Sequence, residues 1–495
     1  MSGQLDPKRA DHLIDGVSRP PAGGAYGPLF DPSDGTQRGE VARGTPDDAR
    51  SAVDSAAVVE ERWAYTPGHE RARVLRDLSA RLRSDKEALA RLICTEVGKP
   101  IRDARVEVER AVGVFSMAAE EIRQLTGQTY PADAYAIPPG NEKRLLFTVR
   151  EPVGLVVAIS PFNFPLNLLS HKVAPALAAG NPVIAKPASV APMTALRLAQ
   201  LALDAGLPAG VFNVVLGSGP DVGFPLVEHD RTRLVTFTGS TSVGRSIAEA
   251  AGRGAKRVIL EMGGMDPLIV FRDASLSDAV EAATRGAFGY SGQVCTATKR
   301  IFVEQSIAEE FGRAFVSRVQ HLKVGPALDE STEVGPLVDR ESLSRIETMV
   351  SDARDRGART LTGGTPLGGS GAGNFFTPTV LDQVPEDARV VREEPFGPLA
   401  PIQQFSTEQE AIRLARRTIY GLQAAVYTRD LGRAFRVARA LPVGGVHIND
   451  PTNLRWDALP FGGVRMSGLG REGLASALRE MTDEKTISVN FGSGP

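Results

Sequence analysis

Cysteine is scarce in this chain, which has two in 495 residues. Two cysteines do not make a disulfide framework, so a reducing cytoplasm is the simplest compartment. The first 15 residues are polar and mixed in charge, without the apolar centre of a signal peptide. The sequence also lacks an apolar run long enough to span a bilayer. We therefore expect a cytoplasmic protein with no membrane partner.

Neither sign of charge dominates, and the formal net charge is -2. A nucleic-acid-binding protein would show a basic surface, so nucleic acid is not an expected partner. Apolar residues make up 42% of the chain and charged residues 23%, as in ordinary globular proteins. A chain of this length exceeds a single hydrophobic core, so we expect two or three domains.

The pattern of apolar residues changes along the chain. Residues 46–125 show helical spacing and predict a series of amphipathic helices. From Gly154, apolar runs and helical patterns alternate, and residues 155–159 read as a buried parallel strand. A second region of this kind runs from about Gly263 to Arg465. The expected fold class is α/β, with doubly wound sheets.

Two strand-like segments stand apart from these regions. Residues 144–150 follow a connector rich in proline, glycine and alanine, and residues 486–491 lie near the C-terminus. An isolated strand must pair with something. We expect the two to pair with each other or with another subunit.

Cys295 is the strongest candidate for chemistry. It follows Gly289-Tyr290-Ser291-Gly292-Gln293-Val294, a segment of small and flexible residues that could present a thiol to a substrate. A lone cysteine is more often a small buried hydrophobe, so catalysis is one of two interpretations on this segment alone. Cys94 lies in a helical apolar pattern and is predicted to be structural.

Three further segments join predicted strands to polar groups. Two prolines bracket Asn163 and would aim its amide, which could donate to a developing oxyanion or belong to a plain turn. Gly239 and Ser240 join a strand to a helix whose N-terminus would attract anions, although they also suit an ordinary cap. Glu261 ends an apolar strand, where burial would raise its pKa and suit a general base; a salt-bridged strand end is the alternative.

The order of six segments resembles that of the aldehyde dehydrogenase superfamily, over nearly the whole chain. The separation of 34 residues between Glu261 and Cys295 is also similar. The six segments are Phe162-Asn163-Phe164-Pro165, Phe237-Thr238-Gly239-Ser240, Leu260-Glu261-Met262-Gly263-Gly264, Gly292-Gln293-Val294-Cys295, Glu393-Glu394-Pro395-Phe396-Gly397-Pro398 and Pro460-Phe461-Gly462-Gly463.

The resemblance implies a mechanism. Cys295 would attack an aldehyde, Asn163 and the Cys295 N–H would hold the oxyanion, and hydride transfer to NAD(P) would leave a thioester. Glu261 would activate the water that releases a carboxylic acid. The resemblance implies no metal. It assigns cofactor binding to Ser160, Pro161, Phe162, Lys186, Ser189, Gly219, Phe237, Gly239, Ser240, Val243, Glu394 and Phe396. Asn449 also matches a family position near the active site.

Ser189 bears on the choice of cofactor. NAD-preferring members often carry a glutamate at this position, and a carboxylate would repel the 2′-phosphate of NADP. Serine can instead donate a hydrogen bond to that phosphate. The sequence therefore favours NADP, or use of both cofactors.

His171, Arg455 and Phe461 are the predicted substrate-binding residues. The resemblance implies that Arg455 borders the substrate entrance. His171 stands where family members that oxidise simple apolar aldehydes carry a bulky aromatic residue. A cation and an imidazole suit a small polar or anionic aldehyde, and Arg110 could add to them or form a surface salt bridge. The sequence resembles the branch of the family that contains lactaldehyde, semialdehyde, phosphonoacetaldehyde and non-phosphorylating glyceraldehyde-3-phosphate dehydrogenases. Val294 stands where its phosphate users carry arginine, which argues against a tightly held phosphate.

The implied architecture has three parts. A Rossmann-like dinucleotide-binding domain takes residues 1–130 and 152–262, an α/β catalytic domain takes 263–465, and a small β oligomerisation element takes 131–151 and 479–495. The family forms homodimers or homotetramers. Three alternatives remain: a CoA-acylating member, which usually lacks the glutamate at 261; a non-catalytic binding protein on this scaffold; and a cysteine hydrolase, which would need a histidine partner.

Overall fold

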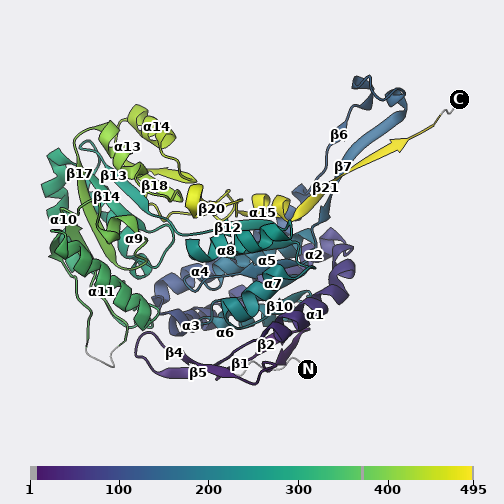
Figure 1. The fold of residues 1–495 in the computed structure, drawn as a ribbon, viewed down its shortest axis with the longest axis horizontal. Helices are drawn as coiled ribbons and strands as arrows, with labels where there is room; N and C mark the ends of the chain where they lie inside the picture. The colour runs from purple at the N-terminus through teal and green to yellow at the C-terminus, as the bar shows by residue number, and fades with distance from the viewer. Residues whose placement is uncertain (1–7, 369–372, 493–495) are drawn as a thin grey trace.

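The computed structural model describes residues 8–368 and 373–492. Two lobes lie side by side, and an arm of strands extends from one of them (Figure 1). Residues 1–7 of the predicted dinucleotide domain and 493–495 of the predicted oligomerisation element lie outside the described residues. Within the described ranges, none of the helices is long and apolar enough to cross a membrane.

The predicted helical region is confirmed as four consecutive helices, α1 (Pro46–Ala64), α2 (Gly68–Ser84), α3 (Lys86–Val97) and α4 (Ile101–Glu121). The first begins with a capping box, in which Thr45 and Asp48 satisfy free backbone N–H groups. Cys94 is buried in α3, as its apolar pattern predicted, and burial raises the pKa of its thiol to about 12. Buried residues of α2, α3 and α4 share a core with Val156 and Val183 on one face of the first sheet, whereas most of those of α1 pack with Val157 and Ile184 on the other face.

The first sheet has eight strands in the order β20-β12-β11-β8-β9-β10-β2-β3. From β8 the chain adds β9 and then β10 on one side of the parallel centre, and afterwards adds β11 and β12 on the other side. The strand order therefore reverses between β8 and β11. Doubly wound sheets bind ligands at this reversal, beyond the carboxyl ends of the strands. The strands are β2 (His12–Ile14), β3 (Val17–Arg19), β8 (Val156–Ile159), β9 (Val183–Lys186), β10 (Phe212–Val214), β11 (Leu234–Thr238), β12 (Arg257–Glu261) and β20 (Gly468–Leu469).

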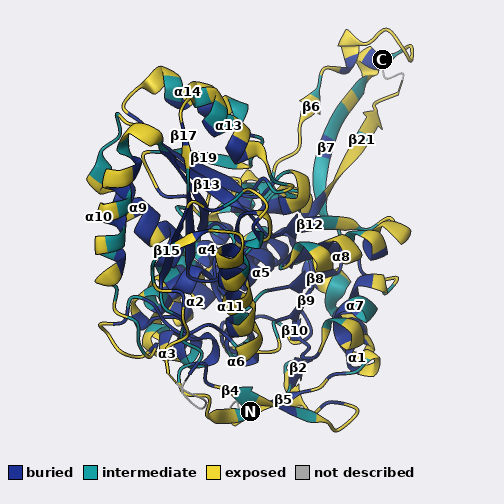
Figure 2. Cartoon of the chain, turned by 60° about the vertical axis from the view of Figure 1, so that its left-hand side comes forward, coloured by how far each residue is buried: buried dark blue, intermediate teal, exposed yellow. Residues whose placement is uncertain are grey.

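Helices on both faces bury this sheet, as Figure 2 shows for β8, β9 and β10. The doubly wound α/β prediction is confirmed. The helices are α5 (Asn167–Ala179), α6 (Pro192–Asp204), α7 (Phe224–Glu228), α8 (Thr241–Arg253) and α15 (Leu474–Glu480). The N-terminal strands β1 (Arg9–Ala10), β4 (Tyr26–Phe30) and β5 (Gln37–Ala42) form a separate small sheet that the sequence pattern did not predict.

The second lobe contains a seven-stranded sheet in the order β15-β16-β17-β14-β13-β18-β19, parallel except for β15. Its strands are β13 (Asp266–Val270), β14 (Thr298–Glu304), β15 (Arg359–Thr362), β16 (Thr379–Asp382), β17 (Leu399–Phe405), β18 (Gln423–Tyr427) and β19 (Gly445–Ile448). Its helices are α9 (Leu276–Phe288), α10 (Ala308–Gln320), α11 (Arg340–Asp355), α12 (Arg389–Arg392), α13 (Glu408–Arg416) and α14 (Leu431–Ala440).

The arm joins the two segments expected to be isolated strands. β7 (Arg144–Pro152) pairs antiparallel with β21 (Thr482–Asn490), with Phe147 opposite Ile487, so the expected pairing within the chain is confirmed. The connector contributes β6 (Thr129–Tyr130), a short strand on the other side of β7 that was not expected. β21 lies at the edge of this sheet and is mostly exposed (Figure 2).

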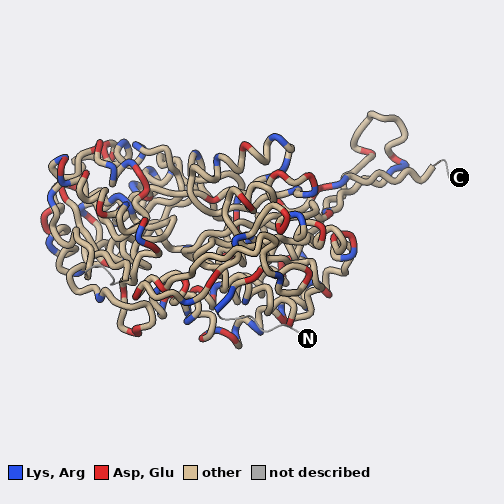
Figure 3. The backbone as a smooth tube through the Cα atoms, turned by 60° about the horizontal axis from the view of Figure 1, so that its bottom comes forward, with Lys and Arg blue, Asp and Glu red and all other residues tan. Residues whose placement is uncertain are grey.

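Along the backbone, the positions of acidic and basic residues are interspersed over both lobes (Figure 3). This distribution agrees with the formal net charge of -2.

Candidate active site

The loop before Cys295 has an unusual backbone. Tyr290, Ser291 and Gly292 have φ of 46°, 56° and 69°, in the left-handed region that non-glycine residues seldom adopt. A Cβ on Gly292 would lie 2.2 Å from the carbonyl oxygen of Gly397, so only glycine fits there. The Tyr290 hydroxyl donates to Val97 O at 2.8 Å and the Ser291 hydroxyl to Gly335 O at 2.7 Å. The turn that presents Cys295 is therefore held firmly.

Glu261, at the end of β12, lies beside the Cys295 thiol. Burial and the negative charge of Glu472 raise the pKa of Glu261 to about 7, which confirms the expected rise. Burial and the neighbouring Glu261 carboxylate raise the pKa of Cys295 well above its usual value. Neither Glu261 oxygen has a hydrogen-bond partner among the described residues. A carboxyl of this pKa beside a protonated thiol can accept its proton near neutral pH.

Asn163 follows β8 and is buried. One N–H of its amide donates to the carbonyl oxygen of Gln293 at 2.9 Å, two residues before the cysteine. A primary amide has two N–H groups, so the second is available to an oxyanion at Cys295. The Gln293 amide itself bonds to Pro336 and Val338, which fixes this part of the loop.

A cavity of about 680 Å³ connects these three residues with the ends of the first sheet. This volume lies in the range of cofactor sites. Among the predicted cofactor residues, the cavity is lined by Pro161, Phe162, Gly239, Ser240, Glu394 and Phe396. The sequence did not assign a cofactor role to the other residues that line it, which are Ala188, Thr238, Met262, Gly263, Asp339, Glu341, Ser342, Ser344, Arg345 and Thr348. Several of these lie on α11, which carried no recognised motif.

The N-terminus of α8 offers an anion-binding end to this cavity. Ser240 caps the helix by accepting the N–H of Val243 at 3.4 Å. The unpaired N–H groups of a first helical turn attract a diphosphate. Phe237 is buried in β11, and Gly239 follows its last residue. The residues present therefore fit a dinucleotide.

The other predicted cofactor residues lie around the same sheet edge but do not line the cavity. Ser160 and Lys186 are buried at the ends of β8 and β9, and burial lowers the pKa of Lys186 to about 8. Ser189 is exposed and donates to Gly217 O at 3.2 Å. Gly219 begins the turn after β10 with open space beside it. Their roles stay predictions.

Glu394 is fixed by contacts from two segments. Its carboxylate accepts the N–H of Gly264 at 3.2 Å and pairs with the buried Lys299 at 2.8 Å. A Cβ on Gly263 would lie 2.2 Å from a Glu394 oxygen, so the glycine is needed for this approach. Lys299 also donates to the Cys295 carbonyl oxygen. A carboxylate held this way could bind the ribose hydroxyls of a dinucleotide.

The cationic residues expected to bind the substrate are already paired with carboxylates of the chain. Arg110 forms two hydrogen bonds with Asp457, at 3.0 and 2.6 Å, and His171 Nε2 lies 2.9 Å from the same carboxylate. Arg455 pairs with Glu472 at 3.1 Å and lies 3.9 Å from the centre of the Phe461 ring. The open cationic channel expected from the sequence is thus a buried network of ion pairs.

Glu472 belongs to this network of ion pairs and also acts electrostatically on Glu261, the expected general base. It accepts from Lys172 at 2.7 Å and from Arg455, and its charge acts on Glu261. Sequence reasoning missed Lys172, Lys299, Asp457 and Glu472. Buried charges need partners, and the pairs they form here lie far apart in the chain, so no local spacing indicated them.

Glu472→Gln is expected to move the activity profile to lower pH. Removing a negative charge beside Glu261 makes its ionised form less costly, so its pKa falls below about 7. Lys172 keeps its hydrogen bond to Thr238 at 2.8 Å and stays satisfied. The pH dependence of kcat measures this shift. Glu484→Gln, in the arm, is the matched control; an unmoved profile in Glu472→Gln would contradict the electrostatic link.

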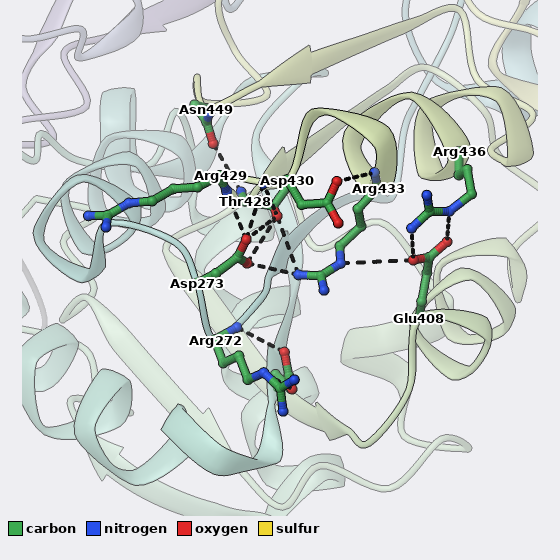
Figure 4. Close-up of polar contacts among 10 residues, drawn as sticks. Arg272, Asp273, Glu408, Thr428, Arg429, Asp430, Arg433, Arg436 and Asn449 are labelled. Carbon is green, nitrogen blue, oxygen red and sulfur yellow. Dashed lines mark hydrogen bonds and ion pairs between the residues drawn. The ribbon is translucent and has the colours of Figure 1, made fainter.

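Asn449 follows β19 and is not among the residues that line the cavity. Its Oδ1 accepts the N–H of Thr428 at 3.0 Å, and its φ is 56°. Thr428 in turn binds Asp273, which also pairs with Arg433 at 2.8 Å (Figure 4). The contacts of Asn449 are therefore those of a turn in the second lobe.

A cavity that fits a dinucleotide, with a thiol, a carboxyl of raised pKa and a buried amide among its lining residues, is typical of an NAD(P)-dependent oxidoreductase. Residues 21–487 match the aldehyde dehydrogenase family. The chain belongs to that family and is an aldehyde-oxidising enzyme.

Curated relatives and solved structures cover nearly the whole chain. A lactaldehyde dehydrogenase of Methanocaldococcus jannaschii is 41% identical, over 90% of this chain and 93% of its own. An NADP⁺ succinate-semialdehyde dehydrogenase of Escherichia coli is 39% identical, over 94% of each. A Staphylococcus aureus betaine aldehyde dehydrogenase point mutant in complex with NAD⁺ has a TM-score of 0.93 and 34% identity, over 98% of this chain and 97% of that one.

Proposed function

We propose that the protein oxidises a small polar or anionic aldehyde to a carboxylic acid through a thiohemiacetal and a thioester on Cys295. The observation that carries this is the convergence of the Cys295 thiol, the Glu261 carboxyl and the Asn163 amide at one end of the cavity. A panel of anionic and neutral aldehydes, followed by absorbance of reduced cofactor, tests it. Absence of reduced cofactor across the panel would favour a non-catalytic binding protein.

Each residue has one task in this scheme. Glu261 takes the thiol proton, and Cys295 attacks the carbonyl carbon. The free N–H of Asn163 and the Cys295 backbone N–H hold the oxyanion. NADP or NAD, when bound, accepts the hydride. After the thiol proton has passed from Glu261 to solvent, the ionised Glu261 takes a proton from the water that hydrolyses the thioester, and the Cys295 thiolate leaves as the carboxylic acid is released.

We infer that NADP is preferred or that both cofactors are used. Ser189 is expected to donate to a 2′-phosphate, and Lys186 to reach the same ribose. Ser189→Glu should lower kcat/KM for NADP by about tenfold or more, since like charges near a surface repel by ~1–4 kcal/mol. Val190→Glu, which adds the same charge one residue further on, is the matched control. A large NAD preference in the unaltered enzyme would contradict the inference.

Charge supports an anionic substituent on the substrate. Lys172, Arg110 and Arg455 face two paired carboxylates, Asp457 and Glu472, which leaves one positive charge in excess when Glu261 is protonated. Relatives of the chain include lactaldehyde, 3-sulfolactaldehyde and succinate-semialdehyde dehydrogenases. The absence of an arginine at Val294 argues against phosphorylated aldehydes.

Arg455→Ala is expected to raise KM for succinic semialdehyde by about tenfold or more and to change KM for propanal by less than about threefold. Removing a desolvated cation weakens binding of an anion by ~1.4 kcal/mol per factor of ten. Steady-state kinetics on both aldehydes measure this difference. Equal changes for the two would show that Arg455 acts only through packing against Phe461.

CoA-acylating activity is the alternative reaction. Glu261 supports hydrolysis instead, because water is far less acidic and less nucleophilic than the thiol of CoA and depends more strongly on a base. Product analysis with and without CoA separates the two. A cysteine hydrolase is not supported, since His171 Nε2 faces Asp457 instead of Cys295.

We also propose that the arm joins subunits into a homodimer or homotetramer. An exposed edge strand can pair with another chain, and Val489 and Phe491 are exposed on or beside β21. The proposed division assigns the eight-stranded sheet, apart from β20, to the dinucleotide domain, the seven-stranded sheet to the catalytic domain and the paired strands β7 and β21 to this element. A cytoplasmic location is consistent with the two free cysteines.

A further inference from the structure

Lys299 is a buried cation that has no task in the proposed scheme. It is 2% exposed and lies on β14, four residues after Cys295. Its ammonium group pairs with Glu394 Oε1 at 2.8 Å and donates to the carbonyl oxygen of Cys295. Burial alone would lower the pKa of this amine, but Glu394 and the buried Asp266 raise it above its usual value, so Lys299 stays charged. One buried charge therefore contacts both the backbone of the nucleophile and a carboxylate that lines the cofactor cavity.

The segment that carries Glu394 depends on its contacts for its shape. Phe396 has a φ of 51°, in the left-handed region, and such a backbone persists only where the surroundings hold it. The Phe396 ring meets the Phe162 ring edge-on, with the ring centres 5.8 Å apart. Lys299 adds a polar contact at the Glu394 side chain, which the ring contact does not reach.

The Glu394 carboxylate is held by one of its two oxygens. Among the described residues, the contacts with Lys299 and with the N–H of Gly264, at 3.2 Å, both go to Oε1. Oε2 lies against Gly263, which also lines the cavity, and a Cβ there would be 2.2 Å from it. Oε2 is therefore left to accept from the ribose hydroxyls of a dinucleotide. Lys299 fixes the carboxylate without occupying the oxygen that the cofactor would use.

Lys299 and Glu394 have opposite effects on the thiol. Burial and the Glu261 carboxylate raise the pKa of Cys295, the positive charge of Lys299 opposes that rise, and Glu394 adds to it. The Cys295 thiolate in turn acts on the charge of Arg110. The same ion pair that holds the carboxylate therefore also influences the reactive form of the nucleophile.

We propose that Lys299 is a positioning residue for hydride transfer, which holds the Cys295 turn and the Glu394 carboxylate at a fixed separation. A substrate bound to the thiol and a cofactor bound through its ribose would then meet in one geometry. A displacement of about 1 Å at such a step can cost on the order of 10²-fold in rate. This inference rests on the proposed aldehyde oxidation and deepens it, because Lys299 acts through its two partners.

Cofactor binding tests the contact with Glu394. Lys299→Met, an unbranched side chain of similar length without the charge, should raise the Kd for NADP or NAD by about tenfold or more in a fluorescence titration. In the Glu394→Gln background the same change should raise Kd by less than about threefold, because the group that Lys299 orients is already altered. Lys256→Met, which removes an amine bonded to two backbone carbonyl oxygens, is the matched control and should leave Kd unchanged.

Alkylation by iodoacetamide without cofactor tests the effect on the thiol. The thiolate is the form that reacts, so Lys299→Met should slow labelling of Cys295 at neutral pH by about threefold or more. Glu394→Gln should speed it, because the charge of Lys299 is then no longer neutralised. Peptide masses separate Cys295 from Cys94. A merely structural role would move both variants in the same direction.

Equal changes of Kd in the two backgrounds, or labelling that moves in the same direction in Lys299→Met and Glu394→Gln, would overturn the inference. Formation of reduced cofactor by the unaltered enzyme would still uphold the proposed function. If Lys299→Met does not fold, Glu394→Gln decides alone, since slower or unchanged labelling would overturn the role of Lys299. Failure of the unaltered enzyme to oxidise any aldehyde would overturn the proposed function and, with it, this inference.

Discussion

Replacing Cys295 by alanine is expected to lower kcat/KM on any aldehyde substrate by on the order of 10⁴-fold or more, because the acyl group has no other carrier. The loop geometry explains why no neighbour can substitute. Tyr290 and Ser291 point to Val97 and Gly335, and Thr296 lies beyond the turn. Steady-state kinetics with reduced-cofactor absorbance measure the loss, and fluorescence quenching on NADP binding checks that the cofactor site is intact.

Cys94→Ala is the matched control for this experiment. Cys94 is buried in α3, and burial raises the pKa of its thiol to about 12, so it is inert near neutral pH. Its replacement should leave kcat/KM within about twofold and cost ~1 kcal/mol of stability through lost packing. Substantial activity in Cys295→Ala, or its loss in Cys94→Ala, would contradict the assignment of the nucleophile.

Glu261→Gln is expected to lower the steady-state rate by about 10²- to 10⁴-fold, since a general base contributes that much. The first turnover should be slowed but should persist as a burst of reduced cofactor, because a thiol ionises without the base more readily than water does, so hydrolysis of the thioester suffers most. The glutamine side chain has the same shape and leaves the buried surroundings of Glu261 unchanged. Rapid-mixing kinetics measure the burst and the slow phase separately.

Glu96→Gln provides the control for Glu261→Gln. Burial also raises the pKa of Glu96 to about 7, but its carboxylate accepts the N–H groups of Met193 and Thr194 at the start of α6. Its replacement should weaken that helix end and leave the burst and steady-state rates unchanged. If Glu261→Gln retained full turnover, the role of base would pass to another group.

Much of the fold and the catalytic centre could be predicted because their signals are local. Alternating apolar runs from Gly154 predicted the doubly wound sheet, and that topology places Asn163 and Gly239 at neighbouring strand ends. The glycine before Cys295 predicted a tight turn, which has φ of 69° at Gly292. The carboxylate ending an apolar strand predicted the raised pKa of Glu261.

The substrate side was less predictable because it depends on pairs between distant segments. Arg110 and Asp457 are 347 positions apart, and Lys172 and Glu472 are 300 apart. Arg455 read as a free cation in the sequence, but the fold gives it Glu472 as a partner.

Trapping the acyl-enzyme tests the central claim most directly. Glu261→Gln, mixed with lactaldehyde and NADP or NAD and quenched in acid, should carry the mass of one acyl group on the peptide that contains Cys295. The adduct should disappear with hydroxylamine, which cleaves thioesters, and should be absent without cofactor. An adduct on Cys94, or reduced cofactor formed with no adduct on Cys295, would contradict the mechanism.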